Sequence, residues 1–183
     1  MMRVAPLLIL LIISVLSGCR KDADVTPRRY AYPRVEAYDT VYGNVAVGPV
    51  ELCVNSSAEI SSPRPGWLDI SYPRYGATIH VSAVATDNIA EVMANRRERI
   101  ALNLGGSRAT THSFRAGDFD CTVVECAEAG MTPVQLLAAS PEGIVVSGAA
   151  NIAGSVTPVD SIRPVVAALT ADAIKMLSAL HDD

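Results

Sequence analysis

The chain has 183 residues and a formal net charge of −4 at pH 7. This length fits a single domain with room for a hydrophobic core, and the mild acidity argues against a nucleic-acid-binding protein, which needs a basic surface. Half of the residues are hydrophobic but only 5% are aromatic, so we expect a core built mainly from Val, Ile, Leu and Ala.

The first 18 residues have the organisation of a secretory signal peptide. Arg3 precedes an apolar run over residues 4–16, and the sequence Leu16-Ser17-Gly18-Cys19 closes this run. A charged start, a short apolar stretch and a small-residue cleavage site define such a peptide, whereas a transmembrane helix needs about 20 apolar residues. The last four residues resemble the bacterial lipobox, whose Cys is joined to diacylglycerol and becomes the first residue of the mature chain. We therefore predict that Cys19 is lipidated.

Residues 19–33 mix acidic and basic side chains with proline and hold few apolar residues, which is typical of a solvated tether. The predicted organisation is a lipoprotein signal peptide over 1–18, a flexible tether over 19–33 and one globular domain over 34–183. Two or more acyl chains hold a protein stably on a bilayer. We therefore expect a protein of the bacterial cell envelope, anchored to membrane lipid through Cys19 on the periplasmic side of the outer membrane.

Three further cysteines are Cys53, Cys121 and Cys126, and an odd number in an exported chain leaves at least one free thiol. Cys121 and Cys126 lie on one predicted strand over 120–127. Five residues along a strand span roughly 16 Å, whereas a disulfide needs its Cα atoms within about 7 Å. We predict that these two do not pair, and we interpret all three as small buried hydrophobic side chains.

The first half of the predicted domain is rich in strands. Residues 36–42 and 49–54 are predicted strands, and turn-forming residues predict loops over 55–57 and 61–66. The strongest signal is a hairpin, in which the strands Trp67–Tyr72 and Ala77–Val84 flank a four-residue turn. Alternation along these strands puts the apolar residues on one face, and the other face carries Trp67, Asp69, Ser71, Thr78, His80 and Ser82.

A helix is predicted over 88–104, with Asp87 as its N-cap and Gly105-Gly106 at its end. Its apolar residues at helical spacing are Ile89, Val92, Met93, Ile100 and Leu104. The basic run over 95–99 falls largely on the other side of this helix. We interpret it as a solvated face, and contact with lipid headgroups or an acidic partner is the alternative.

Four short strands are predicted over 109–114, 120–127, 134–139 and 144–149, and a last amphipathic helix over 160–180. The order of strands, helix, strands, helix indicates a single α+β domain, in which an antiparallel β-sheet packs against two helices. Because each helix has a single apolar stripe, we expect both helices on the same face of the sheet.

The sequence contains no recognised pattern of catalytic or cofactor-binding residues. It lacks the nucleophile-elbow, phosphate-loop and dinucleotide motifs, and His80 and His112 are not part of a cluster with zinc-ligand spacing. Ser82, His80 and Asp87 cannot form a nucleophile–base–acid relay from neighbouring positions of one strand face. We therefore predict no catalytic residue, no metal ligand and no cofactor.

The hairpin Trp67–Ser82 resembles the core segment of the gliding-motility lipoprotein GldD family of Bacteroidetes. Shorter matches at 29–34, 111–116 and 157–166 extend the similarity over most of the chain at low identity. Gly48 and Gly66 stand where the family often carries Cys, before a Pro and before the Trp, so a family disulfide there is absent from this chain. The family's aromatic-rich strand before the last helix corresponds to residues 144–150.

The resemblance implies a non-enzymatic component, or an assembly or stability factor, of the gliding-motility and type IX secretion apparatus, with other envelope proteins as partners. The alternative is a tethered small-ligand-binding protein or hydrolase of the periplasm, which a convergent polar pocket would favour. Trp67 is the candidate partner contact, because Trp is enriched at binding hot spots. The competing interpretation of Trp67 is packing beneath residues 34–54 or 55–66.

The lipobox makes a direct prediction for Cys19. Radiolabelled palmitate should enter the wild-type protein and should not enter the Cys19→Ala variant, because the thiol that accepts the lipid is removed. The two proteins are compared by labelling in growing cells, followed by immunoprecipitation. Equal labelling of both would contradict lipidation at Cys19.

Overall fold

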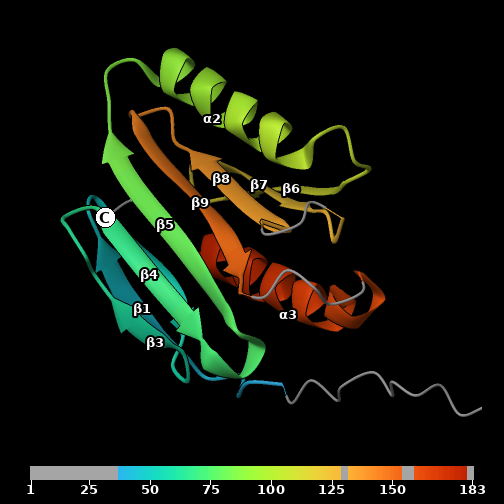
Figure 1. The fold of residues 1–183 in the computed structure, drawn as a ribbon. Helices are drawn as coiled ribbons and strands as arrows, with labels where there is room; N and C mark the ends of the chain where they lie inside the picture. Colours follow the sequence, from blue (N-terminus) through green and yellow to red (C-terminus); the bar gives the residue numbers. More distant parts are fainter. Residues whose placement is uncertain (1–36, 129–131, 154–158, 181–183) are drawn as a thin grey trace, which may run out of the picture. The chain divides into compact units, whose positions relative to one another are not determined.

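The computed structural model describes residues 37–128, 132–153 and 159–180 (Figure 1). Contacts within the chain separate residues 34–183 from residues 1–33, and every element described below belongs to the former. The predicted lipidation site Cys19 and the predicted tether over 19–33 lie outside the described residues. Among the residues that are described, no helix has the length and apolar character needed to cross a membrane.

The domain is α+β, as predicted, with an antiparallel sheet and two helices. Seven strands form the main sheet in the order β3-β4-β5-β9-β8-β7-β6, and β1 pairs only with β2. The strands are β1 (Tyr42–Val47), β2 (Val50–Asn55), β3 (Glu59–Ser61), β4 (Trp67–Tyr72), β5 (Ala77–Ala85), β6 (Thr110–Ala116), β7 (Phe119–Glu125), β8 (Val134–Ala139) and β9 (Ile144–Ile152). The helices are α2 (Ile89–Leu104) and α3 (Val159–Ser178), and a 3-10 turn, η1 (Pro73–Tyr75), joins β4 to β5.

The predicted hairpin is confirmed as β4 and β5, which pair from Trp67↔Ser82 to Tyr72↔Ala77. Gly76 ends the connecting turn with φ 58°, in the left-handed region that glycine adopts without strain. The predicted apolar face is also confirmed, because Leu68, Ile70 and Val81 are all at most 1% exposed. This hairpin places the apolar residues of β4 and β5 in the hydrophobic core.

The apolar face of the main sheet is covered by α3 together with the β1–β2 pair. Helix α3 contacts β2, β6, β7 and β8, and one apolar stripe of it packs on the core, in which Ile162 and Val165 are only partly buried. The fully buried members are Val166, Leu169, Ala173, Met176 and Leu177, and Leu180, just after the helix, is also buried. Tyr42 of β1 donates a hydrogen bond of 2.5 Å to Asp172 of α3, which ties the small sheet to the helix.

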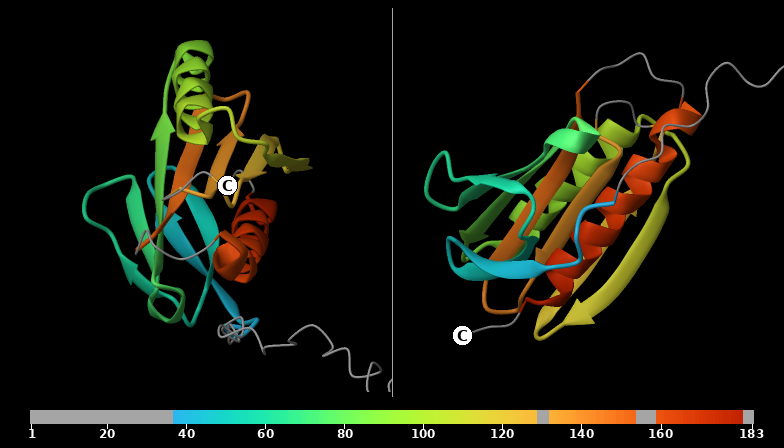
Figure 2. Two further views of the ribbon diagram at one scale, coloured as in Figure 1. Left: turned by 45° about the vertical axis from the view of Figure 1, so that its right-hand side comes forward. Right: turned by 90° about the horizontal axis from the view of Figure 1, so that it is seen from below.

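The prediction that both helices pack on one face of the sheet is wrong. Helix α2 contacts β8 and β9 from the side that carries His80 and Ser82, and Figure 2 shows α2 and α3 on opposite sides of these strands. The reason is visible in β8 and β9, where the consecutive residues Leu136 and Leu137 are both buried, as are Val145 and Val146. Consecutive strand residues point to opposite faces, so the middle of the sheet needs an apolar cover on each side.

Several element boundaries differ from prediction, and one strand was not predicted. The cap of α2 is Asn88, whose Oδ1 accepts the Glu91 backbone N–H at 3.3 Å, and Asp87 lies one residue outside. Residues 37–41 are not a strand, and β1 begins at Tyr42 and continues through Gly43. The short edge strand β3 was not predicted, because three residues give no usable periodicity.

The thiols of Cys53, Cys121 and Cys126 are free in the structure. The predicted strand is confirmed as β7, with Cys121 inside it and Cys126 directly after its last residue. Cys121 and Cys126 are buried, whereas Cys53 is only partly so. Burial, with a smaller contribution from Asp120, raises the pKa of Cys121 to about 11, so this thiol stays protonated near neutral pH.

The tight packing of the sheet centre predicts a large effect of Gly148→Ala in β9. A Cβ at this position would lie 2.6 Å from the His80 backbone oxygen and 3.3 Å from Leu136 Cδ1. The paired backbone of β5 and the packed core side chain cannot move away easily. We therefore expect a loss of about 1–3 kcal/mol in the free energy of unfolding, measured by urea denaturation. The matched control is Gly43→Ala in β1, where the nearest atom, Ser56 Oγ, is 3.6 Å away. Equal stability of the two variants would contradict this picture of the sheet centre.

Candidate functional site

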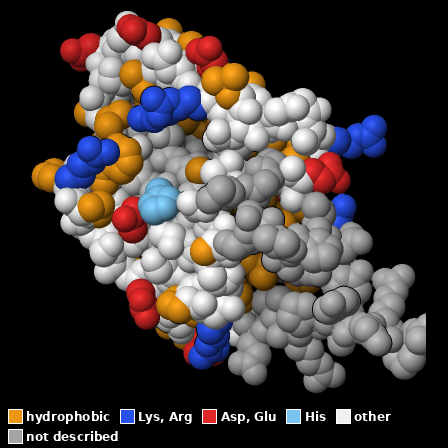
Figure 3. Space-filling model, viewed as in Figure 1, with side chains coloured by type: hydrophobic (Ala, Val, Ile, Leu, Met, Phe, Trp, Pro, Cys, Tyr) orange, Lys and Arg blue, Asp and Glu red, His pale blue; other side chains and the backbone are white. Residues whose placement is uncertain are grey.

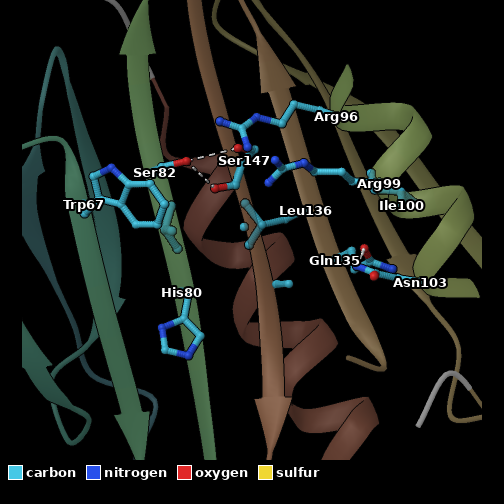
Figure 4. A pocket seen from close by; sticks show the side chains of 13 residues that line it. Trp67, His80, Ser82, Arg96, Arg99, Ile100, Asn103, Gln135, Leu136 and Ser147 are labelled. Carbon is cyan, nitrogen blue, oxygen red and sulfur yellow. Dashed lines mark hydrogen bonds between the residues drawn. The ribbon is translucent and has the colours of Figure 1, made fainter. Parts of the chain in front are cut away.

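A cleft of about 190 Å³ lies between α2 and the face of the sheet opposite α3. Strands β4, β5, β8 and β9 supply its floor and one wall, and α2 supplies the other wall (Figure 4). Basic side chains gather over α2, and others lie beside a histidine, on the same face in the space-filling view (Figure 3). We call this cavity the α2 cleft.

The helix wall of the α2 cleft carries Arg96 and Arg99, with Ile100 and Asn103 one turn further along. Both guanidinium groups extend from α2 over β8 toward β9 and Ser147 (Figure 4). Neither has a hydrogen bond or ion pair with the residues that the structure describes. Partial burial lowers the pKa of Arg96, and the positive charge of Arg99 lowers it further. Arg96 is partly buried and Arg99 is exposed, and their guanidinium groups lie near one another (Figure 4).

The floor of the cleft is set by the register of β5 and β9, which pairs Ser82 with Ser147. The two hydroxyl groups are 3.1 Å apart and both residues are buried. Beside them, His80 is paired with Ala149 across the ladder. His80 Nδ1 lies 2.7 Å from Asp69 Oδ1 on β4, so the imidazole contacts a carboxylate and not the Ser82 hydroxyl.

The far end of the cleft is formed by a pair of amides. Asn103 Nδ2 of α2 donates to Gln135 Oε1 of β8 at 2.9 Å, which links the helix directly to the sheet. Gln135 is only 3% exposed, and its Nε2 has no hydrogen-bond partner. A buried N–H donor without an acceptor lowers the stability of the fold by about 1–3 kcal/mol. The Gln135 Nε2 group could therefore donate a hydrogen bond to a ligand.

The near wall of the cleft is Trp67, the first residue of β4. Its side chain is partly buried, and the guanidinium of Arg64 lies 3.7 Å from the centre of its ring system. Arg64 belongs to the predicted loop over 61–66, so part of the ring is covered by that loop and part faces the cleft. Trp67 is therefore packed in part, as one interpretation held, and its role as a partner contact stays a prediction.

The histidines are not brought together. Strand pairing across β9, β8 and β7 puts His80 of β5 in line with Thr111 of β6, and paired residues lie on the same face of the sheet. His112 is the next residue along β6 and therefore lies on the opposite face. His112 Nε2 is 4.0 Å from Glu125. The described residues contain no group of three or more His, Cys, Asp or Glu side chains able to hold a metal ion.

The residues that sequence reasoning missed are Arg96, Arg99 and Gln135. The basic run over 95–99 was interpreted as a solvated face, and this is wrong for Arg96, which is partly buried, whereas Arg99 is exposed as interpreted but also lines the cleft. A usable signal existed, because position 96 fills the gap between Met93 and Ile100 in the apolar stripe of α2. Gln135 also stood out as the polar residue in the apolar strand Val134–Ala139.

The chemistry of the cleft is that of a receptor for an electron-rich group. Two unpaired guanidinium groups and the free Gln135 Nε2 are all donors, and Trp67, Ile100 and Ala149 supply apolar surface. Guanidinium groups bind carboxylate and phosphate oxygens with two parallel hydrogen bonds. The arrangement therefore suits binding of an anion.

No protein-family model matches the chain, and a search of curated proteins finds no relative of it.

The partial burial of Trp67 predicts an intermediate effect of Trp67→Ala. We expect a loss of about 2 kcal/mol in the free energy of unfolding, below the roughly 3–5 kcal/mol of a fully buried aromatic residue. Arg64→Ala is the matched control, since it removes the cation over the ring and should cost at most about 1 kcal/mol. Chemical denaturation of both variants measures the difference. An unchanged stability of Trp67→Ala would show that the ring does not pack on the sheet.

Proposed function

We propose that this protein is a membrane-anchored envelope lipoprotein that acts, without enzymatic activity, as a component or an assembly or stability factor of a gliding-motility and type IX secretion apparatus. Acylated Cys19 holds it to membrane lipid. Its folded domain, residues 34–183, binds other envelope proteins of that machinery. The proposal rests on the lipobox and on the resemblance to the GldD family carried by Trp67–Ser82.

The observation that carries the proposal is the position of Gly48 and Gly66, where the family often has Cys. A Cβ on Gly48 would lie 3.4 Å from the Gly66 Cα, although the two residues are separated by β2 and β3. Cysteines joined by a disulfide need such closeness. The resemblance alone puts the two family cysteines at positions 48 and 66. The closeness of these positions in the fold supports the resemblance.

The location of the resembling segment also supports a role in recognition. Trp67–Ser82 forms β4 and β5, and its outer face carries Trp67 at the edge of the α2 cleft with Arg64 stacked on the ring. Trp and Arg are the residues most enriched where proteins bind one another. The segment thus combines the family likeness with side chains suited to a partner.

The α2 cleft favours a second candidate function, a tethered protein that binds a small ligand. The polar groups that converge there are donors, and the Ser82 hydroxyl is bonded to Ser147 rather than to an imidazole. This chemistry fits binding of an anionic ligand better than hydrolysis, which needs a nucleophile held against a base.

The first candidate predicts physical association with the secretion machinery. Epitope-tagged wild-type protein, cross-linked in cells and purified from envelope fractions, should recover type IX secretion or gliding components. Depletion of the protein should lower the amounts of those components and of secreted cargo, because a stability factor protects its partners.

The matched control is the same lipoprotein signal and tether, residues 1–33, fused to an unrelated domain, which should recover none of these proteins. Unchanged partner levels and unchanged cargo secretion after depletion would contradict the proposed role, whatever else co-purifies.

A further inference from the structure

We propose that the α2 cleft is a binding site for a small phosphate-bearing ligand, whose phosphate group is held by Arg96 and Arg99. The inference deepens the second candidate function and does not depend on the partner-binding role. It names a ligand class, a phosphate monoester, that is present both in soluble metabolites and in lipid headgroups.

The first step of the argument is the absence of a counter-charge. Among the described residues neither Arg96 nor Arg99 has an ion-pair partner, and the one carboxylate bonded to a residue lining the cleft, Asp69, is engaged by His80. Arg96 is partly buried and Arg99 is exposed, and the like charges of the two neighbouring guanidinium groups repel one another. An anion between them removes that repulsion.

The second step concerns the charge that fits. Two cations are neutralised by a dianion, whereas a carboxylate would leave one positive charge uncompensated. A phosphate monoester carries close to two negative charges at neutral pH, and its oxygens can accept two parallel hydrogen bonds from each guanidinium. The charge balance of the cleft therefore favours phosphate over carboxylate.

The third step is independent of charge. Gln135 lines the same cleft, and its Nε2 is buried and has no acceptor. Figure 4 shows the amides of Gln135 and Asn103 at the end of the cleft away from the two guanidinium groups, so this donor would meet a second acceptor of the ligand. A neutral donor without a partner at this point indicates that an acceptor belongs there.

The last step concerns size and the rest of the ligand. A volume of about 190 Å³ is below the roughly 300–1,000 Å³ typical of sites for drug-sized ligands, so the ligand is a phosphate with a short organic stem. Trp67, Ile100 and Ala149 form the apolar part of the lining. An apolar or planar stem would lie against these side chains while the phosphate reaches the two arginines.

Trp67 makes the test direct, because it is the single Trp of the chain and it lines the cleft. Phenyl phosphate added to the full chain, purified in detergent, should change the Trp fluorescence with a saturable dependence on concentration and raise the melting temperature. Benzoate at the same ionic strength should bind at least about tenfold more weakly, because it lacks the second charge. Dihexanoyl phosphatidic acid, a water-soluble lipid that carries a phosphate monoester, shows which kind of ligand the cleft prefers. If it binds more tightly than phenyl phosphate, the ligand is a lipid, and if it binds more weakly, the ligand is a soluble phosphate.

The variants test whether binding depends on Arg96 and Arg99 in particular or only on the total positive charge of α2. Arg96→Ala and Arg99→Ala should each weaken phenyl phosphate binding by about 10- to 100-fold, the usual effect of losing a charged hydrogen bond. Arg97→Ala is the matched control, because Arg97 lies on the same helix, is exposed and does not line the cleft. It should bind as the wild type does.

Circular dichroism verifies that each variant is folded, and Arg96→Gln replaces Arg96→Ala if the latter is not. No saturable response to either phosphate, equal affinity for benzoate, or equal loss in Arg97→Ala would overturn the proposal. Because the purified protein is tested alone, such a failure leaves the association with secretion components untouched.

Discussion

The fold depends on the apolar character of β8 and β9 on both of their faces. Leu136 and Leu137, and likewise Val145 and Val146, are consecutive and buried, so each pair projects one side chain to each side of the sheet. An antiparallel sheet with a single apolar face can leave its other side in water. This one cannot, and the requirement is met by α3 with the β1–β2 pair on one side and α2 on the other.

The elements themselves were largely predictable, because their signals are local. The β4–β5 hairpin follows from alternation around a Gly-containing turn, and both helices follow from apolar spacing with Gly105 or polar residues at the ends. What the sequence does not state directly is which face of the sheet a helix will cover. The stripe of α2 defines the side of the helix that packs, but only the doubled apolar residues of β8 and β9 indicate that two covers are needed.

The candidate site was less predictable for the same reason. Arg96, Ser147 and Gln135 are far apart in the chain and meet only because α2 crosses the face that carries His80. Each has an ordinary local interpretation, as a solvated cation, a strand polar residue or a buried amide. Trp67 was identified in advance because its residue type alone is informative, whereas the arginines gain their meaning from having no counter-charge in the folded domain.

The cleft and the weak packing of α2 have one physical cause. None of the 16 residues of α2 is fully buried, and Ile89, Met93, Arg96 and Ile100, which recur at helical spacing, are all partly buried. Arg96 occupies the central position of that stripe, where an aliphatic side chain would bring the helix against Val145 and Leu137. A guanidinium is longer and keeps contact with water or an anion, so it does not fill that position as a packed apolar side chain would. Stability alone would favour an apolar residue at position 96. The residue present instead gives up packing and leaves a cavity lined with unpaired donors, which is the arrangement that a bound anion would complete.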